Sequence, residues 1–190
     1  MKSICVFCGS KPGKSGLYEN AAVELGFAMA EKNIQLIYGG GGIGLMGIIA
    51  DAIMKTGGTV VGVIPRFLSE RELGHSNISE LILVESMHQR KQKMAELADG
   101  FIALPGGFGT LEELCEILTW RQLHLVTKPI GILNVNGFYD HLEKQLSHMV
   151  QEGFLEEEHK RLLIIENDPQ KLINKLLSFS MPEKQEIDKT

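Results

Sequence analysis

Glycines and acidic residues stand together in the stretch Pro105-Gly106-Gly107-Phe108-Gly109-Thr110-Leu111-Glu112-Glu113. An apolar run at residues 101–104 precedes it and an apolar-periodic segment at 111–123 follows, which predicts a strand, a glycine turn and a helix start with acids in its first turn. Glycines let a backbone approach a ligand closely, and the free N–H groups of a helix start bind phosphate. Anion binding does not require carboxylates. The stretch therefore predicts a site that binds an anion and also carries out chemistry.

A purely structural interpretation of the same residues is a capping box. In it, Thr110 caps the helix and Glu113 reaches back to the backbone of the cap. Three closely spaced glycines and the strand before them favour a ligand site, as does a second glycine turn elsewhere in the chain.

This second turn, residues 39–47, directly follows an apolar run and contains the pattern G-x-G-x-x-G. The acidic residue that reads the ribose of NAD is missing after the next strand, which runs into Pro65 and Arg66, so a dehydrogenase is disfavoured. The turn predicts close approach to a small phosphorylated ligand. The residues predicted for this phosphate turn, with one from the turn after the first strand, are Ser10, Gly40, Gly41, Gly42 and Gly44.

The third element is the basic stretch 87–94, in which Arg90 interrupts an apolar helical face formed by Met87, Met94 and Leu97. A cation near a helix start opposes the helix dipole, and a half-buried cation needs an anionic partner. A substrate phosphate or a catalytic carboxylate would supply it. A solvated basic helix is the alternative, and it is the default interpretation for Lys93.

These motifs, with Thr119-Trp120, Lys128-Pro129-Ile130-Gly131 and the stretch 134–139, resemble the LOG family, the cytokinin riboside 5′-monophosphate phosphoribohydrolases. Members of this family were often labelled lysine decarboxylases. The resemblance covers nearly the whole chain apart from its tail. It implies hydrolysis of the N-glycosidic bond of an adenine-type nucleoside 5′-monophosphate to free base and ribose 5-phosphate, by a homodimer without a cofactor.

The resemblance also implies roles for individual residues. The catalytic pair falls on Arg90 and Glu113. The substrate-binding positions are Glu72, Arg90, Lys91, Gly107, Phe108, Gly109, Thr110, Leu111, Glu112, Glu113 and Thr119.

The chemistry fits these residue types. Glycosidic cleavage passes through an oxocarbenium-like state, which a carboxylate stabilises while it positions or activates water. Glu113 is the candidate for this role, and Arg90 would orient it or neutralise the phosphate. The sequence shows no evident acid for the departing base. We interpret Glu116 as a surface residue, and Glu112 either as a ribose contact or as a complement to the helix dipole.

Two other functions compete with hydrolysis. A nucleotide or cofactor carrier on the same fold would bind through the same glycine turns without turnover, and it would not need the Arg90–Glu113 pair. A pyridoxal-phosphate decarboxylase would need a Schiff-base lysine, and Lys91 is the only lysine in the motifs.

The elements that must position these residues alternate along the chain. Apolar runs predict strands at 4–8, 35–38, 60–64, 81–84, 101–104, 130–133 and 162–165, and amphipathic patterns predict helices at 17–32, 45–55, 88–98, 111–123, 139–151 and 169–179. This alternation predicts a doubly wound α/β fold of the Rossmann-like type, with a largely parallel sheet and helices on both faces. We expect one domain over residues 1–180 and a polar tail at 181–190, with ligands at the carboxyl ends of the strands.

Composition narrows the function class. A net charge of −5 argues against nucleic acid or an anionic membrane as partner, and no apolar run is long enough to span a membrane. The start of the chain lacks a signal-peptide pattern and three cysteines cannot all pair, so we expect a cytoplasmic protein. Cys5 and Cys8 are interpreted as core residues, because positions three apart in a strand point to opposite faces. The six histidines show no metal-ligand spacing, and we expect no metal.

Overall fold

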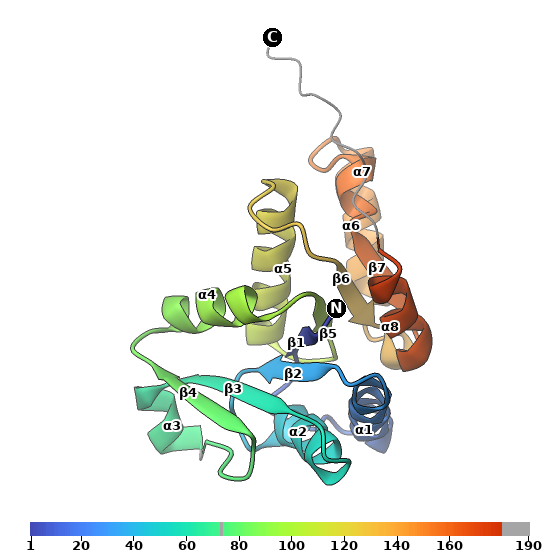
Figure 1. Cartoon of the computed structure of the whole chain (residues 1–190). Coiled ribbons are helices and arrows are strands. Elements are labelled where there is room, and N and C mark those ends of the chain that lie inside the picture. The colour runs from blue at the N-terminus through green and yellow to red at the C-terminus, as the bar shows by residue number, and fades with distance from the viewer. Residues whose placement is uncertain (73, 180–190) are drawn as a thin grey trace.

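One sheet of seven parallel strands forms the centre of the molecule (Figure 1). The computed structural model describes residues 1–72 and 74–179, with side chains described outside residues 70–73. The predicted tail at 181–190 lies outside the described residues, so the boundary at residue 180 stays a prediction. The strand order is β4-β3-β2-β1-β5-β6-β7. The strands are β1 (Ser3–Phe7), β2 (Gln35–Tyr38), β3 (Val60–Pro65), β4 (Glu80–Val84), β5 (Phe101–Ala103), β6 (Ile130–Leu133) and β7 (Leu163–Glu166).

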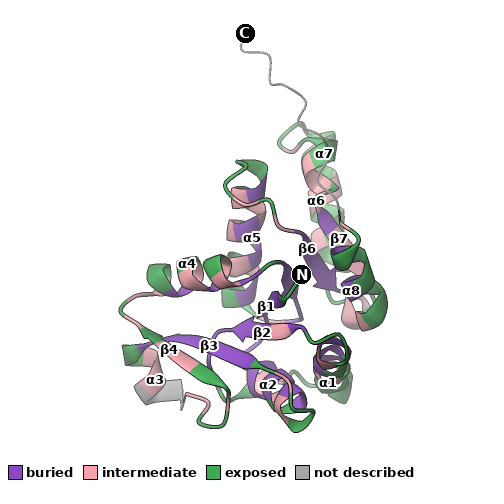
Figure 2. Cartoon of the chain, in the orientation of Figure 1, coloured by how far each residue is buried: buried purple, intermediate pink, exposed green. Residues whose placement is uncertain are grey.

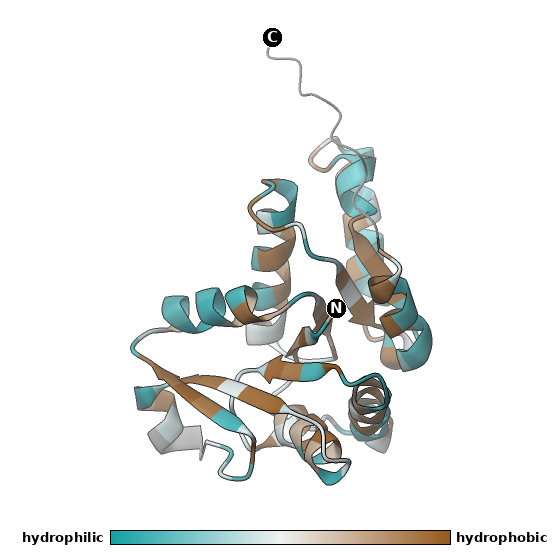
Figure 3. Cartoon of the chain, in the orientation of Figure 1, coloured by the Kyte–Doolittle hydropathy of each residue, from teal (hydrophilic) through white to brown (hydrophobic). Residues whose placement is uncertain are grey.

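Helices cover both faces of this sheet, as the predicted doubly wound fold requires. The helical segments are α1 (Gly16–Glu31), α2 (Gly44–Lys55), α3 (Arg66–Glu72), α4 (Met87–Leu97), α5 (Phe108–Gln122), η1 (Val135–Gly137), α6 (Asp140–Gln151), α7 (Glu157–Lys160) and α8 (Pro169–Leu177). Helices α1, α2 and α8 pack on one face and α4, α5 and α6 on the other. Both faces of the central strands are therefore buried and apolar (Figures 2 and 3).

The strand predictions are confirmed to within one residue at each end, because runs of apolar residues buried on both faces leave little ambiguity. Three short elements were not predicted: α3, η1 and α7. The charged stretch 70–72 is the end of α3. Polar segments of this length carry little periodic signal, so their local conformation depends on the packed neighbours.

The strand order reverses between β1 and β5, which makes this point the topological switch point of the sheet. From β1 the chain adds β2, β3 and β4 on one side, and it then returns to place β5 against the other side of β1. Connections leave the carboxyl ends of these two strands in opposite directions and open a crevice there. The turns after β1 and β5, at residues 9–13 and 105–107, lie at this point.

Local capping sets where α4 begins. Ser86 accepts a hydrogen bond from the Gln89 backbone N–H at 3.2 Å, and the Gln89 side chain accepts one from the Glu85 N–H at 2.9 Å. These reciprocal bonds satisfy backbone donors that the helix itself leaves free. They fix Met87 as the first helical residue and Arg90 as the fourth.

Helix α5 begins three residues earlier than predicted, at Phe108, with Gly107 as its N-cap and no capping side chain. The capping-box interpretation is therefore wrong, because Thr110 lies inside the first turn, where it is buried. Glu112 and Glu113 consequently lie in the second turn and not in the first. The glycine stretch is part of the helix start itself.

Candidate active site

The Arg90 guanidinium is buried at the carboxyl ends of β2 and β3. Its Nη2 donates to the Gly39 carbonyl oxygen at 2.7 Å and its Nε to the Val63 carbonyl oxygen at 3.1 Å. The residue is only 7% exposed. The predicted burial is confirmed. In the described part of the chain no carboxylate forms an ion pair with Arg90, whose two oxygen partners are neutral carbonyls, so of the two predicted anionic partners the substrate phosphate stays a prediction.

Gly39 makes this arrangement possible. A Cβ atom at position 39 would lie 1.9 Å from Arg90 Nη2. Any side chain there would displace the guanidinium from its carbonyl partners. The first glycine of the 39–47 turn therefore makes room for an arginine.

Glu113 extends from α5 toward α4 into a small crevice whose apolar walls include Phe7, Ile117 and Trp120. Burial raises the pKa of Glu113 to about 7, because it disfavours the charged carboxylate. The positive charge of Arg90 acts in the opposite direction and lowers this pKa. Arg90 and Glu113 therefore influence each other through space, without direct contact.

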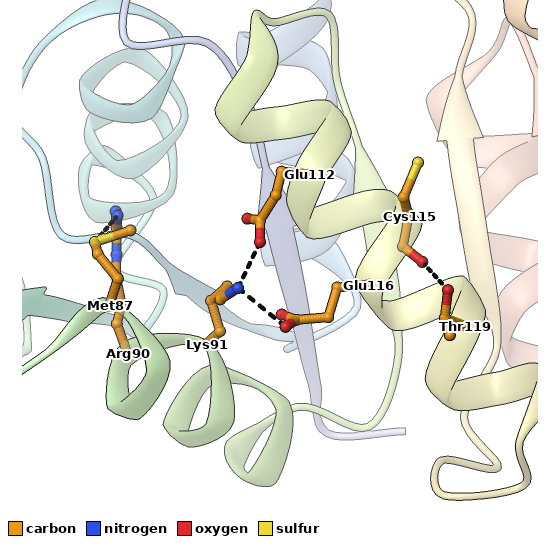
Figure 4. A network of polar contacts seen from close by, with 7 residues as sticks. All are labelled: Met87, Arg90, Lys91, Glu112, Cys115, Glu116 and Thr119. Atoms are coloured by element: carbon orange, nitrogen blue, oxygen red, sulfur yellow. Dashed lines mark hydrogen bonds and ion pairs between the residues drawn. The ribbon is translucent and has the colours of Figure 1, made fainter.

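Lys91 forms ion pairs that the sequence did not predict. Its Nζ lies 2.5 Å from Glu112 Oε1 and 2.9 Å from Glu116 Oε1, so it bridges α4 and α5 (Figure 4). The interpretation of Glu116 as a surface residue is wrong, since its side chain is 27% exposed and ion-paired. The acids were spaced one helical turn apart, but only the tertiary structure brings Lys91 between them.

A cleft of about 350 Å³ opens at the carboxyl ends of β1 and β5, where the topology predicts a ligand. Its walls are the turn 9–13, the turn 105–107 and the side chains of Tyr18, Leu45 and Phe138. The Gly9 N–H donates to the Pro105 carbonyl at 3.1 Å and holds the two turns together.

The start of α5 borders this cleft with an uncapped helix end. A Cβ atom added at Gly107 or Gly109 would meet nothing within 4 Å, so the backbone here faces open space. Gly106 is different, because its Cβ would lie 2.1 Å from the Thr110 hydroxyl. The free N–H groups of the first turn are the kind of donors that bind an anion.

The 39–47 turn is built mainly for internal packing. Gly44 has a φ of 60°, and a Cβ there would lie 2.3 Å from the carbonyl carbon of Ser10. The Leu45 N–H donates to the Gly9 carbonyl at 3.0 Å. Of the predicted phosphate-turn residues, Ser10 lines the cleft, whereas Gly40, Gly41, Gly42 and Gly44 are not among its lining residues.

The remaining predicted substrate-binding positions differ in their surroundings. Phe108 is 94% exposed at the start of α5, and Leu111 is partly buried against the core. The Thr119 hydroxyl donates to the Cys115 carbonyl of its own helix at 2.8 Å, on an exposed face (Figure 4). The Glu72 side chain lies outside the described residues.

Sequence reasoning missed the aromatic wall of the cleft. Tyr18 and Phe138 pack edge to face with ring centroids 5.9 Å apart. Each closely follows a glycine, since Tyr18 lies in the first turn of α1, which begins at Gly16, and Phe138 directly follows Gly137 at the end of η1. This position was the available signal, although it is weaker than a motif.

Two features are absent from the residues that the structure describes. No group of three or more histidine, cysteine, aspartate or glutamate side chains there is arranged to hold a metal ion. No helix in the same part of the chain is long and apolar enough to cross a membrane.

Comparison with known proteins decides the family. A family model described as "Possible lysine decarboxylase" matches residues 46–176. The chain is 47% identical over 182 residues to the cytokinin riboside 5′-monophosphate phosphoribohydrolase LOG of Oryza sativa subsp. japonica, covering 96% of this chain and 75% of the relative. It is 49% identical over 172 residues to LOG2 of Arabidopsis thaliana, with 90% and 81% covered. The chain belongs to the LOG family.

Solved structures share the fold of this chain. TM1055 superposes with a TM-score of 0.72 at 22% identity, covering 94% of this chain and 100% of that one. A molybdenum cofactor binding protein from Rippkaea orientalis superposes with a TM-score of 0.70 at 21% identity, covering 94% and 97%. At such identities these likenesses concern the fold alone.

The raised pKa of Glu113 predicts a measurable effect on stability. The ordinary pKa is 4.5 and the folded value is about 7, so the folded state binds a proton more tightly than the unfolded chain. The contribution of the neutral carboxyl is fully present below the ordinary pKa and is lost as the pH rises through the folded pKa. Glutamine cannot lose a proton. The free energy of unfolding of Glu113→Gln, relative to that of wild type, should therefore rise by about 3 kcal/mol when the pH is raised from about 4 to about 8.

Urea unfolding of both proteins at the two pH values measures this difference. Glu24→Gln, the same substitution at an exposed position of α1, is the matched control. Parallel stability curves for wild type and Glu113→Gln would contradict the assigned burial of the carboxyl.

Proposed function

We propose that this protein hydrolyses the N-glycosidic bond of adenine-type nucleoside 5′-monophosphates, releasing the base and ribose 5-phosphate. The observation that carries the proposal is a shielded carboxyl, Glu113, with a pKa near 7 and within the field of the buried Arg90 guanidinium. The names of the relatives support it, since those at 44–49% identity are phosphoribohydrolases of cytokinin riboside 5′-monophosphates.

Glu113 suits the central step of this reaction. A carboxyl that titrates near 7 is present in both protonation states at neutral pH. Its ionised form stabilises the positive charge that develops on the sugar, and it can accept a proton from the attacking water. Burial strengthens this electrostatic effect, because less water screens the charge.

Arg90 complements this carboxylate. Arginine is always protonated in proteins, and the Gly39 and Val63 carbonyls orient its guanidinium without neutralising its charge. The uncompensated positive charge lets an anionic substrate and the Glu113 carboxylate occupy one site.

The cleft between β1 and β5 is the proposed phosphate site. The uncapped start of α5, the Ser10 turn and Lys11 offer backbone N–H groups and a positive charge. Binding the phosphate away from the reacting bond supplies energy to orient and distort the ribosyl group. A nucleoside without phosphate would lose this contribution.

Two other functions are less well supported. A Schiff-base decarboxylase needs a neutral lysine amine. For Lys91, burial acts to lower the pKa, but hydrogen bonds to Glu112 and Glu116 outweigh it and raise the pKa above its usual value. A carrier function finds likeness in solved structures at 20–23% identity, and such a likeness concerns the fold.

Turnover of candidate substrates is the first test. Incubation with AMP and with isopentenyladenosine monophosphate should release free base and ribose 5-phosphate, whereas the nucleosides should react poorly. Glu113→Gln should bind AMP but lose turnover by at least about 10²-fold, since the carboxylate acts in the transition state. Glu152→Gln, a substitution at the end of α6, is the control. Wild-type rates in Glu113→Gln would refute the assigned role.

The placement of Arg90 is tested without removing its charge. Gly39→Ala brings a Cβ into the space of the guanidinium and should lower kcat by about 10²-fold, because misplacement of about 1 Å has effects of this size. Gly16→Ala is a matched control, since a Cβ there meets nothing within 4 Å. A steady-state comparison in which both variants behave like wild type would exclude the proposed role of Arg90.

We also propose that two copies form a homodimer. Leu123, Leu125 and Phe154 are 59%, 70% and 85% exposed, and no residue of the amphipathic helix α6 is fully buried. A second copy that covers these apolar side chains would remove them from water. Light scattering should give twice the chain mass of 21.0 kDa, and Leu125→Glu should reduce it toward the monomer. A wild-type monomer at micromolar concentration would contradict this.

A cytoplasmic location is proposed as well. Cys5, Cys8 and Cys115 are free thiols in the described structure, the first two of them buried. Free thiols persist where the compartment is reducing.

A further inference from the structure

Lys91 occupies an unusual position for a lysine. Its side chain is only 10% exposed, and its ammonium group lies between the carboxylates of Glu112 and Glu116. Both acids belong to α5, one helical turn apart, whereas Lys91 belongs to α4 (Figure 4). The two helices flank a crevice here, so this charged cluster is a direct connection between them at this level.

The neighbours of the cluster in sequence are the two residues proposed for catalysis. Lys91 directly follows Arg90 on α4, and Glu112 directly precedes Glu113 on α5. An ion pair with short, directional hydrogen bonds restricts how the two helices slide and rotate against each other. Restricting the helices at this point also restricts the distance between Arg90 and Glu113.

Direct phosphate binding by Lys91 fits the geometry poorly. Two of the three N–H donors of its ammonium group are directed at carboxylates. The two carboxylates carry more negative charge than the single ammonium neutralises, so a phosphate approaching it would be repelled.

We propose that Lys91 is a positioning residue, which through Glu112 and Glu116 holds α4 against α5 so that Arg90 and Glu113 keep their relative placement. This inference rests on the proposed function for its catalytic consequence. It stands beside the substrate contact that the family resemblance implies for Lys91 and Glu112, which stays a prediction.

The cluster also sets the charge around Glu113. The groups that face this carboxyl are Arg90 and Lys91 from α4, Glu112 and Glu116 from α5, and the thiols of Cys5 and Cys8 from the region of β1. Burial raises the pKa of both thiols, which keeps them neutral. Removal of Lys91 leaves two negative charges unbalanced beside Glu113, and this should raise the pKa of Glu113 further.

The test compares Lys91→Met with Lys93→Met. Lys93 lies on the same helix and pairs more loosely with Glu96, at 3.7 Å, with 42% of its side chain exposed. Both variants replace a lysine of α4 with methionine, but only Lys91→Met removes the charged cluster. Carbon-13 NMR titration of the Glu113 carboxyl in the ligand-free protein, assigned with Glu113→Gln, gives a readout independent of turnover.

In Lys91→Met, the Glu113 titration midpoint should rise and kcat for AMP should fall about 10- to 100-fold, with a much smaller change in KM. Lys93→Met should change neither quantity. Lys91→Arg should restore most of kcat, because a guanidinium can bridge both acids. Glu116→Gln should move the midpoint in the opposite direction, downward, which distinguishes an electrostatic effect from partial unfolding.

Two outcomes would overturn the inference. The first is a raised KM with unchanged kcat and an unchanged Glu113 midpoint in Lys91→Met, which would identify a direct substrate contact. The second is an equal effect in Lys93→Met, which would indicate general loss of charge. If wild type hydrolyses no nucleotide while the Glu113 midpoint still rises in Lys91→Met, the proposed function fails and the role of the cluster stands.

Discussion

The contact on which the site depends is the one between the Arg90 guanidinium and the Gly39 and Val63 carbonyl oxygens. A buried arginine is usually stabilised by a carboxylate, and here it is stabilised by the ends of two strands. The carbonyls accept from Nε and Nη2 and leave the positive charge of the guanidinium available to the rest of the site. The arrangement requires a glycine at position 39, because a Cβ atom would occupy the place of Nη2.

The negative charge of the site, the Glu113 carboxylate, is also in an unfavourable environment, because it is largely removed from water. Glu113 is ionised at the expense of folding stability, since burial raises its pKa to about 7. Buried charged groups are typical of functional sites, where they lower the folding stability that the rest of the fold provides. Seven strands covered on both faces provide a core large enough for this.

The fold alone does not determine the function. Molybdenum cofactor proteins share the same architecture at TM-scores near 0.7 but only 21–23% identity. What distinguishes members of such a fold is the set of side chains at the switch point of the sheet. In this chain that set includes Ser10 and Lys11 beside the cleft, Arg90 on α4, Glu113 on α5, and Lys91, which pairs with Glu112 and Glu116 across these two helices.

The sequence by itself determined the seven strands and their parallel arrangement, and it singled out Arg90 as a cation on an otherwise apolar helical face. These follow from local patterns: apolar runs, glycine turns and a cation that interrupts an apolar face. It did not determine the start of α5, because Thr110 and Glu113 match the sequence pattern of a capping box. It also did not determine the environment of Glu116, which the sequence assigned to the surface. Only the tertiary structure decided that Gly39 makes room for Arg90, that Lys91 pairs with two acids on another helix, and that Tyr18 and Phe138 form one wall. Each of these contacts joins residues from different elements, and no local pattern records which partner the packing will bring within hydrogen-bonding distance.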